Sequence, residues 1–165
     1  MKKLTMIAAA LLVTGCTSPI EITGEDVTAR IRDGVNRDRL TSYRPMEVRS
    51  FVTQNGQQIE LAGLPCELTS DEITANIVTP ARVNLPRFVQ SGEYEDRGRP
   101  GQMQIRCEGG GYEGAETIFA QDKQVGTATN AGIGGAILTT VVTAAIASST
   151  PWQYPPATRV PVRAE

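Results

Sequence analysis

The sequence predicts a mainly β protein with one short helix before the strands and one after them. Three observations predict this arrangement. Between residues 46 and 122, apolar and polar residues alternate over several short stretches, which is the period of a strand with one buried face. Apolar residues at close to helical spacing precede this region. An uncharged, apolar stretch rich in small residues follows it.

The first fifteen residues have the pattern of an export signal. Met1-Lys2-Lys3 is a basic start, and residues 4–13 are apolar but too few to cross a bilayer as a stable helix. The next residues, Val13-Thr14-Gly15-Cys16, resemble the lipobox of bacterial lipoproteins. The resemblance implies cleavage before Cys16 and acylation of Cys16. In a Gram-negative host, Thr17 in place of aspartate implies transfer to the outer membrane, facing the periplasm. The alternative is an ordinary secretory peptide with an incidental cysteine.

Cys66 and Cys107 remain as a pair in an oxidising compartment, where two cysteines are more often bridged than free. A bridge that closes about 42 residues would stabilise the fold by about 4 kcal/mol in the chain-entropy model. The alternative is a pair of buried, reduced cysteines that pack as small hydrophobic side chains. A metal site made of two thiolates is less favoured.

Residues 16–45 are expected to form a polar tether that contains a short helix. Thr23-Gly24-Glu25-Asp26 has the pattern of a capping box, and four apolar residues follow at roughly helical intervals, at Val27, Ile31, Val35 and Leu40. This pattern predicts a helix over residues 25–40. Arginines and aspartates between residues 30 and 39 would form its solvated face, with contact to lipid phosphate as the sharper alternative.

Residues 46–122 are expected to form the β-domain. Asn55-Gly56 lies between two apolar stretches and predicts a hairpin, because both residues tolerate positive φ. Residues 73–78 and 81–85 predict two more strands, the second stopped by Pro86. Met103, Ile105 and Cys107 alternate with polar residues, which places Cys107 on the core face.

Four features of this region occur together: Thr79-Pro80, the alternation that runs to Leu85, the strand at residues 102–107 and the pair Gly111-Tyr112. Over about residues 65–120 they resemble the PEGA module of exported and membrane-anchored bacterial proteins, although the PEGA tetrapeptide is absent. The resemblance implies a small antiparallel β-sandwich with a structural or surface-binding role. It carries over no catalytic residues.

Residues 123–150 form an apolar segment, and no charged residue occurs between Lys123 and Arg159. Small residues recur every four positions from Ala128 to Ser148, which on a helix would form one stripe. The spacing resembles the glycine-zipper segments of bacterial envelope lipoproteins. That resemblance implies membrane or partner-helix contact through Gly132, Ala136, Thr140 and Ala144. Packing on the chain's own domain, membrane association and self-association all stay open.

The proline-rich stretch at residues 151–156 ends that helix. Trp152 and Tyr154 either lie at a lipid interface or return the chain to the β-domain, where residues 158–162 would add an edge strand. We favour the return strand. The expected organisation is a leader at 1–15, a tether at 16–45, a β-domain at 46–122, an apolar segment at 123–150 and a return strand or tail at 151–165.

Composition removes most catalytic and metal-binding chemistry. The 165 residues include no histidine, which excludes imidazole bases and imidazole metal ligands, and a net charge of -2 gives no reason to bind nucleic acid. The glycine-rich residues 108–114 lack the lysine and hydroxyl of a phosphate-binding loop, so they indicate a turn. Weak candidates for acid–base or nucleophilic chemistry remain at Glu93, Glu95, Asp96, Lys123, Ser70 and Ser91.

The sequence therefore predicts a lipid-anchored cell-envelope protein that acts as a structural or binding module, without catalysis, cofactor or metal. Its expected partners are the membrane, through the lipid on Cys16, and a second envelope protein or another copy of itself. One alternative is a subunit of a multiprotein envelope assembly. Another is a cell-wall enzyme or its accessory, which would require an acid–base pair in a cleft.

Overall fold

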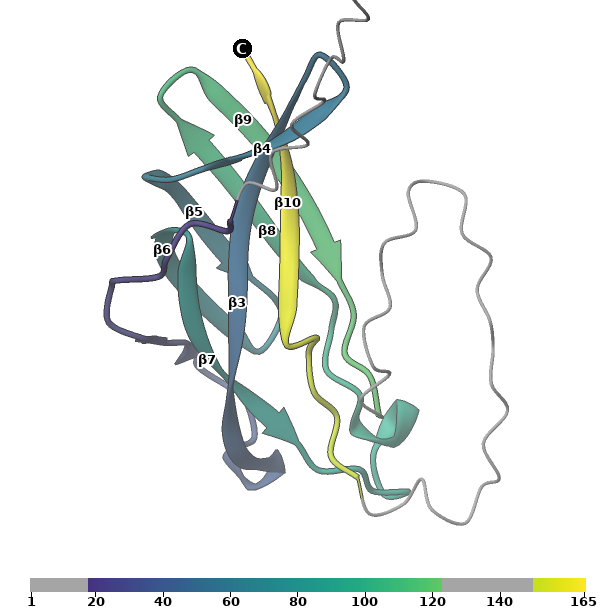
Figure 1. The fold of residues 1–165 in the computed structure, drawn as a ribbon. Coiled ribbons are helices and arrows are strands. Elements are labelled where there is room, and N and C mark those ends of the chain that lie inside the picture. The colour runs from purple at the N-terminus through teal and green to yellow at the C-terminus, as the bar shows by residue number, and fades with distance from the viewer. Residues whose placement is uncertain (1–17, 123–149) are drawn as a thin grey trace, which may run out of the picture.

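A ten-stranded sheet contains most of the residues that the computed structural model describes, which are 18–122 and 150–165 (Figure 1). Two 3-10 turns, η1 (Arg37–Arg39) and η2 (Glu95–Gly98), accompany it. The strands are β1 (Val27–Thr28), β2 (Arg30–Ile31), β3 (Leu40–Gln54), β4 (Gln57–Leu61), β5 (Leu64–Thr69), β6 (Ile73–Thr79), β7 (Ala81–Phe88), β8 (Met103–Gly109), β9 (Tyr112–Ile118) and β10 (Ala157–Ala164).

The strand order is β1-β7-β3-β10-β9-β8-β5-β6-β2, and β4 pairs with the far end of β3. β1 pairs with β7 and β2 pairs with β6, so residues 27–31 join the two ends of this order. The backbone N–H of Ala29 also donates to the carbonyl of Asn84 on β7 at 3.0 Å. The sheet therefore nearly closes on itself, and it takes strands from residues 27–31 and 157–164 as well as from 40–118.

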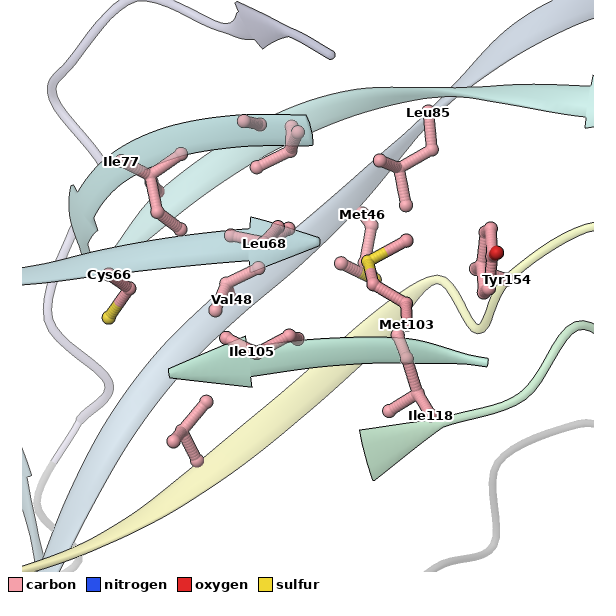
Figure 2. Packing of buried hydrophobic residues seen from close by; sticks show 14 of the residues in the cluster. Met46, Val48, Cys66, Leu68, Ile77, Leu85, Met103, Ile105, Ile118 and Tyr154 are labelled. Carbon is pink, nitrogen blue, oxygen red and sulfur yellow. The ribbon is translucent and has the colours of Figure 1, made fainter. Parts of the chain in front are cut away.

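The core fills the inside of this curved sheet because apolar residues alternate along almost every strand. Val48, Leu68, Ile73, Val83 and Ile105 are completely buried. Figure 2 shows side chains from several strands meeting in this interior. Each such side chain contributes about 1.5–3 kcal/mol when it leaves water, so the alternation sets which face of each strand points inward.

The two turns predicted from glycine patterns are confirmed. Gln54 pairs with Gln57 across a two-residue loop in which Asn55 and Gly56 have φ of 51° and 77°. Gly110 and Gly111, with φ of 59° and 78°, form the turn between β8 and β9, and Gly109, the last residue of β8, also has a positive φ. Glycine at these positions avoids the steric cost that a Cβ atom would bring.

The return strand forms, but the prediction of an edge strand is wrong. β10 lies inside the sheet, parallel to β3 and antiparallel to β9. Val160 and Val162 point into the core, with exposed fractions of 0% and 7%. Pro161 lacks a backbone donor, and the pairing with β9 covers only residues 162–164. Gly114 permits this close approach, because a Cβ there would lie 2.8 Å from the Cα of Val162.

The predicted N-terminal helix over residues 25–40 is wrong, since the described residues contain no helix of seven residues or more. Val27 and Ile31 instead extend along β7 and β6, whose edges offer backbone partners that an isolated helix could not use. Gly34, with φ of 86°, then turns the chain into η1. Helical spacing of four apolar residues was too weak a signal against these edges.

The β-sandwich is also wrong, because one nearly closed sheet encloses the core where a sandwich would have two packed sheets. Pro86 does not stop its strand; β7 continues to Phe88, which pairs with Leu40. The predicted C-terminal helix lies outside the described residues, and the structure gives it no support.

Candidate functional site

A hollow of about 840 Å³ lies on the outer surface of the sheet, beside the β3–β4 hairpin (Figure 1 locates these strands). Its walls come from residues 18–20, the second half of β3, the strand β4 and Arg159 of β10. We call this hollow the hairpin groove. It brings together three parts of the chain that are far apart in the sequence.

An ion pair holds the N-terminal segment in the hairpin groove. Arg49 of β3 lies 2.6 Å from the carboxylate of Glu60 on β4, and the two side chains are only 17% and 9% exposed. The backbone N–H of Ile20 donates to Glu60 Oε2 at 2.9 Å, and the carbonyl of Ile20 accepts from Arg49 Nη1 at 2.8 Å. Both backbone groups of one residue are therefore bound by the two halves of one ion pair.

The Arg49–Glu60 ion pair, which we call the clamp because it binds Ile20, stays charged. Burial alone would lower the pKa of Arg49, but hydrogen bonds and charge interactions with Glu60 and then Glu47 raise the pKa above its ordinary value. Glu47 lies 3.3 Å from Arg49. The positive charge of Arg49 is thus balanced inside the protein.

Arg159 provides the unbalanced charge of the hairpin groove. It is the register partner of Arg49 on the neighbouring strand, and its guanidinium lies over the ring of Phe51, 4.2 Å from the centroid. Its Nη1 donates to Gln58 Oε1 at 3.2 Å. Within residues 18–122 and 150–165, Arg159 forms no ion pair. Since a guanidinium carries five N–H donors, several remain available to a ligand in the groove.

A second hollow, of about 580 Å³, lies over the outer faces of β5, β6 and β8. Glu67 and Arg106 face each other across its floor, and Val78 is 57% exposed at its side. It is wide and shallow, which is typical of a surface patch more than of an enclosed ligand site.

The opposite end of β5 carries a buried polar cluster, which we call the polar plug: Ser70, Glu72, Gly101 and Tyr154. Ser70 Oγ donates to Glu72 Oε2 at 3.2 Å and accepts from the backbone N–H groups of Glu72 and Ile73. The Glu72 carboxylate accepts from the N–H of Gly101 at 3.1 Å. Tyr154 donates its hydroxyl to the carbonyl of Gly101 at 2.7 Å. Burial raises the pKa of Tyr154.

The residues singled out from the sequence have different fates. Cys66 and Cys107 form a disulfide with an S–S distance of 2.01 Å, directly across β5 and β8. The hydroxyl of Ser70, a candidate nucleophile, forms its hydrogen bonds within the polar plug. Ser91 accepts a hydrogen bond from the N–H of Glu93. Other candidate residues lie outside the described part: Cys16, Lys123, Gly132, Ala136, Thr140 and Ala144.

The acidic candidates Glu93, Glu95 and Asp96 lie in the loop between β7 and β8, and none of them lines either hollow. In the part of the chain that the structure describes, no three acidic or cysteine side chains are grouped so as to hold a metal ion. Of the described residues, none belongs to a helix long and apolar enough to cross a membrane.

Sequence reasoning did not find the hairpin groove. Residues 18–20, 49–60 and 159 meet only because β10 inserts next to β3 and the N-terminal segment turns onto the hairpin. The one available signal was the outward position of Arg159 between the inward-facing Thr158 and Val160. No protein-family model, curated protein or solved structure matches this chain.

Proposed function

We propose that this chain is a lipid-anchored protein of the cell envelope, in which the β-domain works without catalysis as a structural or binding module held at a membrane surface. The observation that carries the proposal is the clamped N-terminal segment. Ile20 is bound through both backbone groups only four residues after Cys16. An acyl group on Cys16 would therefore hold the domain in one orientation, where a long free tether would let it rotate.

Chain length supports this reading. Ser18 follows Cys16 by two positions, and a fully extended chain spans at most about 7 Å over that distance. Ser18 lines the hairpin groove. The lipid anchor would thus attach next to the groove and bring the β3–β4 hairpin to the bilayer surface.

The disulfide supports a compartment outside the cytosol. Cys66 and Cys107 are 4% and 0% exposed and lie opposite each other on paired strands. Such a buried bridge stabilises the fold and persists in oxidising compartments such as the periplasm. The Ser70 hydroxyl is bound within the polar plug, and the acidic candidates lie away from both hollows; both observations favour a non-catalytic role over a cell-wall enzyme.

The test compares the wild-type chain with Cys16→Ser after expression in a Gram-negative host. We expect the wild type to sediment with membranes and to show, by intact mass, a terminus at Cys16 that carries acyl groups. Cys16→Ser should be recovered in the soluble fraction. A companion chain that lacks residues 126–149 should stay with the membranes, which separates lipid anchoring from insertion of that segment. An uncleaved leader, or a mature terminus without acyl mass, would overturn the proposal.

A further inference from the structure

We infer that the hairpin groove binds the phosphate-bearing headgroup of a membrane phospholipid, so that the β3–β4 hairpin docks on the bilayer that holds the anchor. This inference rests on the proposed function, because the anchor supplies the position of the membrane. It goes beyond the proposed function, because lipid attachment at Cys16 does not by itself assign a ligand to the hairpin groove.

The position of the hairpin groove next to Cys16 would bring it to the headgroup layer of the membrane. The headgroup layer on each side of a bilayer is about 5–7 Å thick, given a hydrocarbon core of about 30 Å within a total of about 40–45 Å. Cys16 would enter this layer with its acyl chains, and Ser18 lies within about 7 Å of Cys16 along the chain. Ser18 and Ile20 are themselves walls of the groove. Headgroups are therefore the molecules that the groove meets first.

The charge of Arg159 suits a phosphate ligand. Arg49 is neutralised by Glu60 and Glu47, whereas Arg159 is bound, among the described residues, only by the oxygen of Gln58 and the ring of Phe51. A guanidinium presents several N–H donors in a planar fork, and the tetrahedral oxygens of a phosphate accept two of them at once. The Phe51 ring holds the guanidinium in place, so little side-chain freedom is lost when the phosphate binds.

The remaining walls select one kind of phosphate compound. Glu60 lines the groove, and its carboxylate and that of Glu47 both lie beside Arg49, so a compound with several negative charges would be repelled. A phosphodiester carries a single negative charge. Ile20 is 36% exposed at the groove and offers apolar contact to the glycerol and ester region next to that phosphate. A bare acyl chain is disfavoured, because it would cover the charged and amide groups of Arg159 and Gln58 without pairing them.

The test is an NMR titration of the mature chain, residues 16–165, carrying Cys16→Ser, which has neither leader nor acyl group and therefore reports on the groove alone. The probe is dihexanoylphosphatidylglycerol below its critical micelle concentration. We expect amide shifts to concentrate at Ile20, Phe51, Gln58 and Arg159. Arg159→Gln should weaken binding roughly tenfold, the loss expected for one charge-assisted pair. Ile20→Asp, which keeps the backbone clamp but adds a negative charge, should weaken it as well.

Matched controls use the same changes elsewhere. Arg163 lies on the same strand, is exposed and pairs with Glu113, so Arg163→Gln should bind as the parent does. Val78→Asp places the same charge on another exposed apolar position of the sheet and should also have no effect.

Three outcomes would overturn the inference: no shifts at the groove, equal weakening by Arg163→Gln and Arg159→Gln, or binding of inorganic phosphate as tight as that of the short-chain lipid. Failure of the proposed function looks different. In that case the wild-type chain carries no acyl mass, while the titration of the Cys16→Ser chain still gives its own answer about the groove.

Discussion

The polar plug and the hairpin groove use polar side chains in opposite ways. In the polar plug, which follows the C-terminal end of β5, Ser70, Glu72 and Tyr154 are almost completely buried and satisfy one another and the backbone. The hairpin groove lies on the outer surface of β3, β4 and β10. There Arg159 is exposed and keeps unused donors.

This difference separates residues that maintain the fold from residues that can bind a ligand. A buried polar group without its partner costs about 1–3 kcal/mol, so a closed network is expected wherever polar groups lie in the core. A partly satisfied guanidinium at the surface costs little and remains available. Substitutions in the polar plug should therefore lower stability and leave binding intact, and substitutions of the exposed groove side chains should weaken binding with little loss of stability.

The largest expected effect on stability comes from the disulfide, which joins β5 to β8. The polar plug follows β5. Replacing both cysteines, Cys66→Ala with Cys107→Ala, should lower the free energy of unfolding by about 4 kcal/mol, because the bridge closes a loop of sequence separation 41. Urea denaturation of the oxidised parent and the double variant measures the change. Headgroup binding by the folded double variant should equal that of the parent. A change below about 1 kcal/mol would mean that the bridge does not stabilise the fold.

Ser70→Ala should have the next largest effect, about 2–3 kcal/mol. It removes a donor to Glu72 Oε2 and the acceptor of two buried backbone N–H groups. Ser91→Ala is the control, since Ser91 accepts one exposed hydrogen bond and its loss should be nearly neutral. Thermal or urea unfolding separates the two variants. If Ser70→Ala were as mild as Ser91→Ala, the polar plug would not be a stabilising network.

Sequence patterns correctly predicted the individual strands next to the polar plug and the β3–β4 hairpin. Alternating residues placed Cys107 in the core, and Asn55-Gly56 fixed the turn, because both depend on residues close together in the chain. The patterns could not show which strands become neighbours. Thr158 to Val162 looked like an edge strand, yet β10 lies between β3 and β9, and only the assembled sheet determines that choice.

Breaking the Arg49–Glu60 ion pair should lower the stability by a smaller amount and should affect the backbone locally, at Ile20. Glu60→Gln removes the charge that pairs with Arg49, and we expect a loss of about 1 kcal/mol together with faster hydrogen exchange at the amide of Ile20. Glu113→Gln breaks the exposed pair with Arg163 and should change neither quantity measurably. Unchanged exchange at Ile20 in Glu60→Gln would show that the ion pair does not hold the N-terminal segment.

The smallest effect concerns a carboxylate that belongs neither to the polar plug nor to the hairpin groove. Burial raises the pKa of Glu116 on β9 above its ordinary value near 4.5. The folded state then holds this proton more tightly than the unfolded state, so its contribution to stability is present below pH 4.5 and is lost as the pH rises through the raised pKa. Glu116→Gln should therefore raise the melting temperature slightly at pH 7 and have no effect at pH 4. A decrease at pH 7 would contradict the assigned burial.

The candidate site was beyond prediction for a similar physical reason. Arg159 and Ile20 are separated by most of the chain, and each is unremarkable in its own surroundings. The groove forms because the backbone of Ile20 binds Arg49 and Glu60. These two residues pair only because the register of the β3–β4 hairpin brings them together. Lipid attachment at Cys16, in contrast, is a local pattern and remains a prediction from the sequence.

The most direct test of the account is the depth of the hairpin groove relative to the bilayer. Acylated protein would be reconstituted into vesicles of phosphatidylethanolamine and phosphatidylglycerol, with a nitroxide label at Gln58 in one sample and at Gln104, on the outer face of β8, in another. Power-saturation EPR would then report the depth of each label. We expect the label at Gln58 to lie in the headgroup layer and the label at Gln104 to remain in water. Equal exposure of both labels to the aqueous relaxant would contradict it.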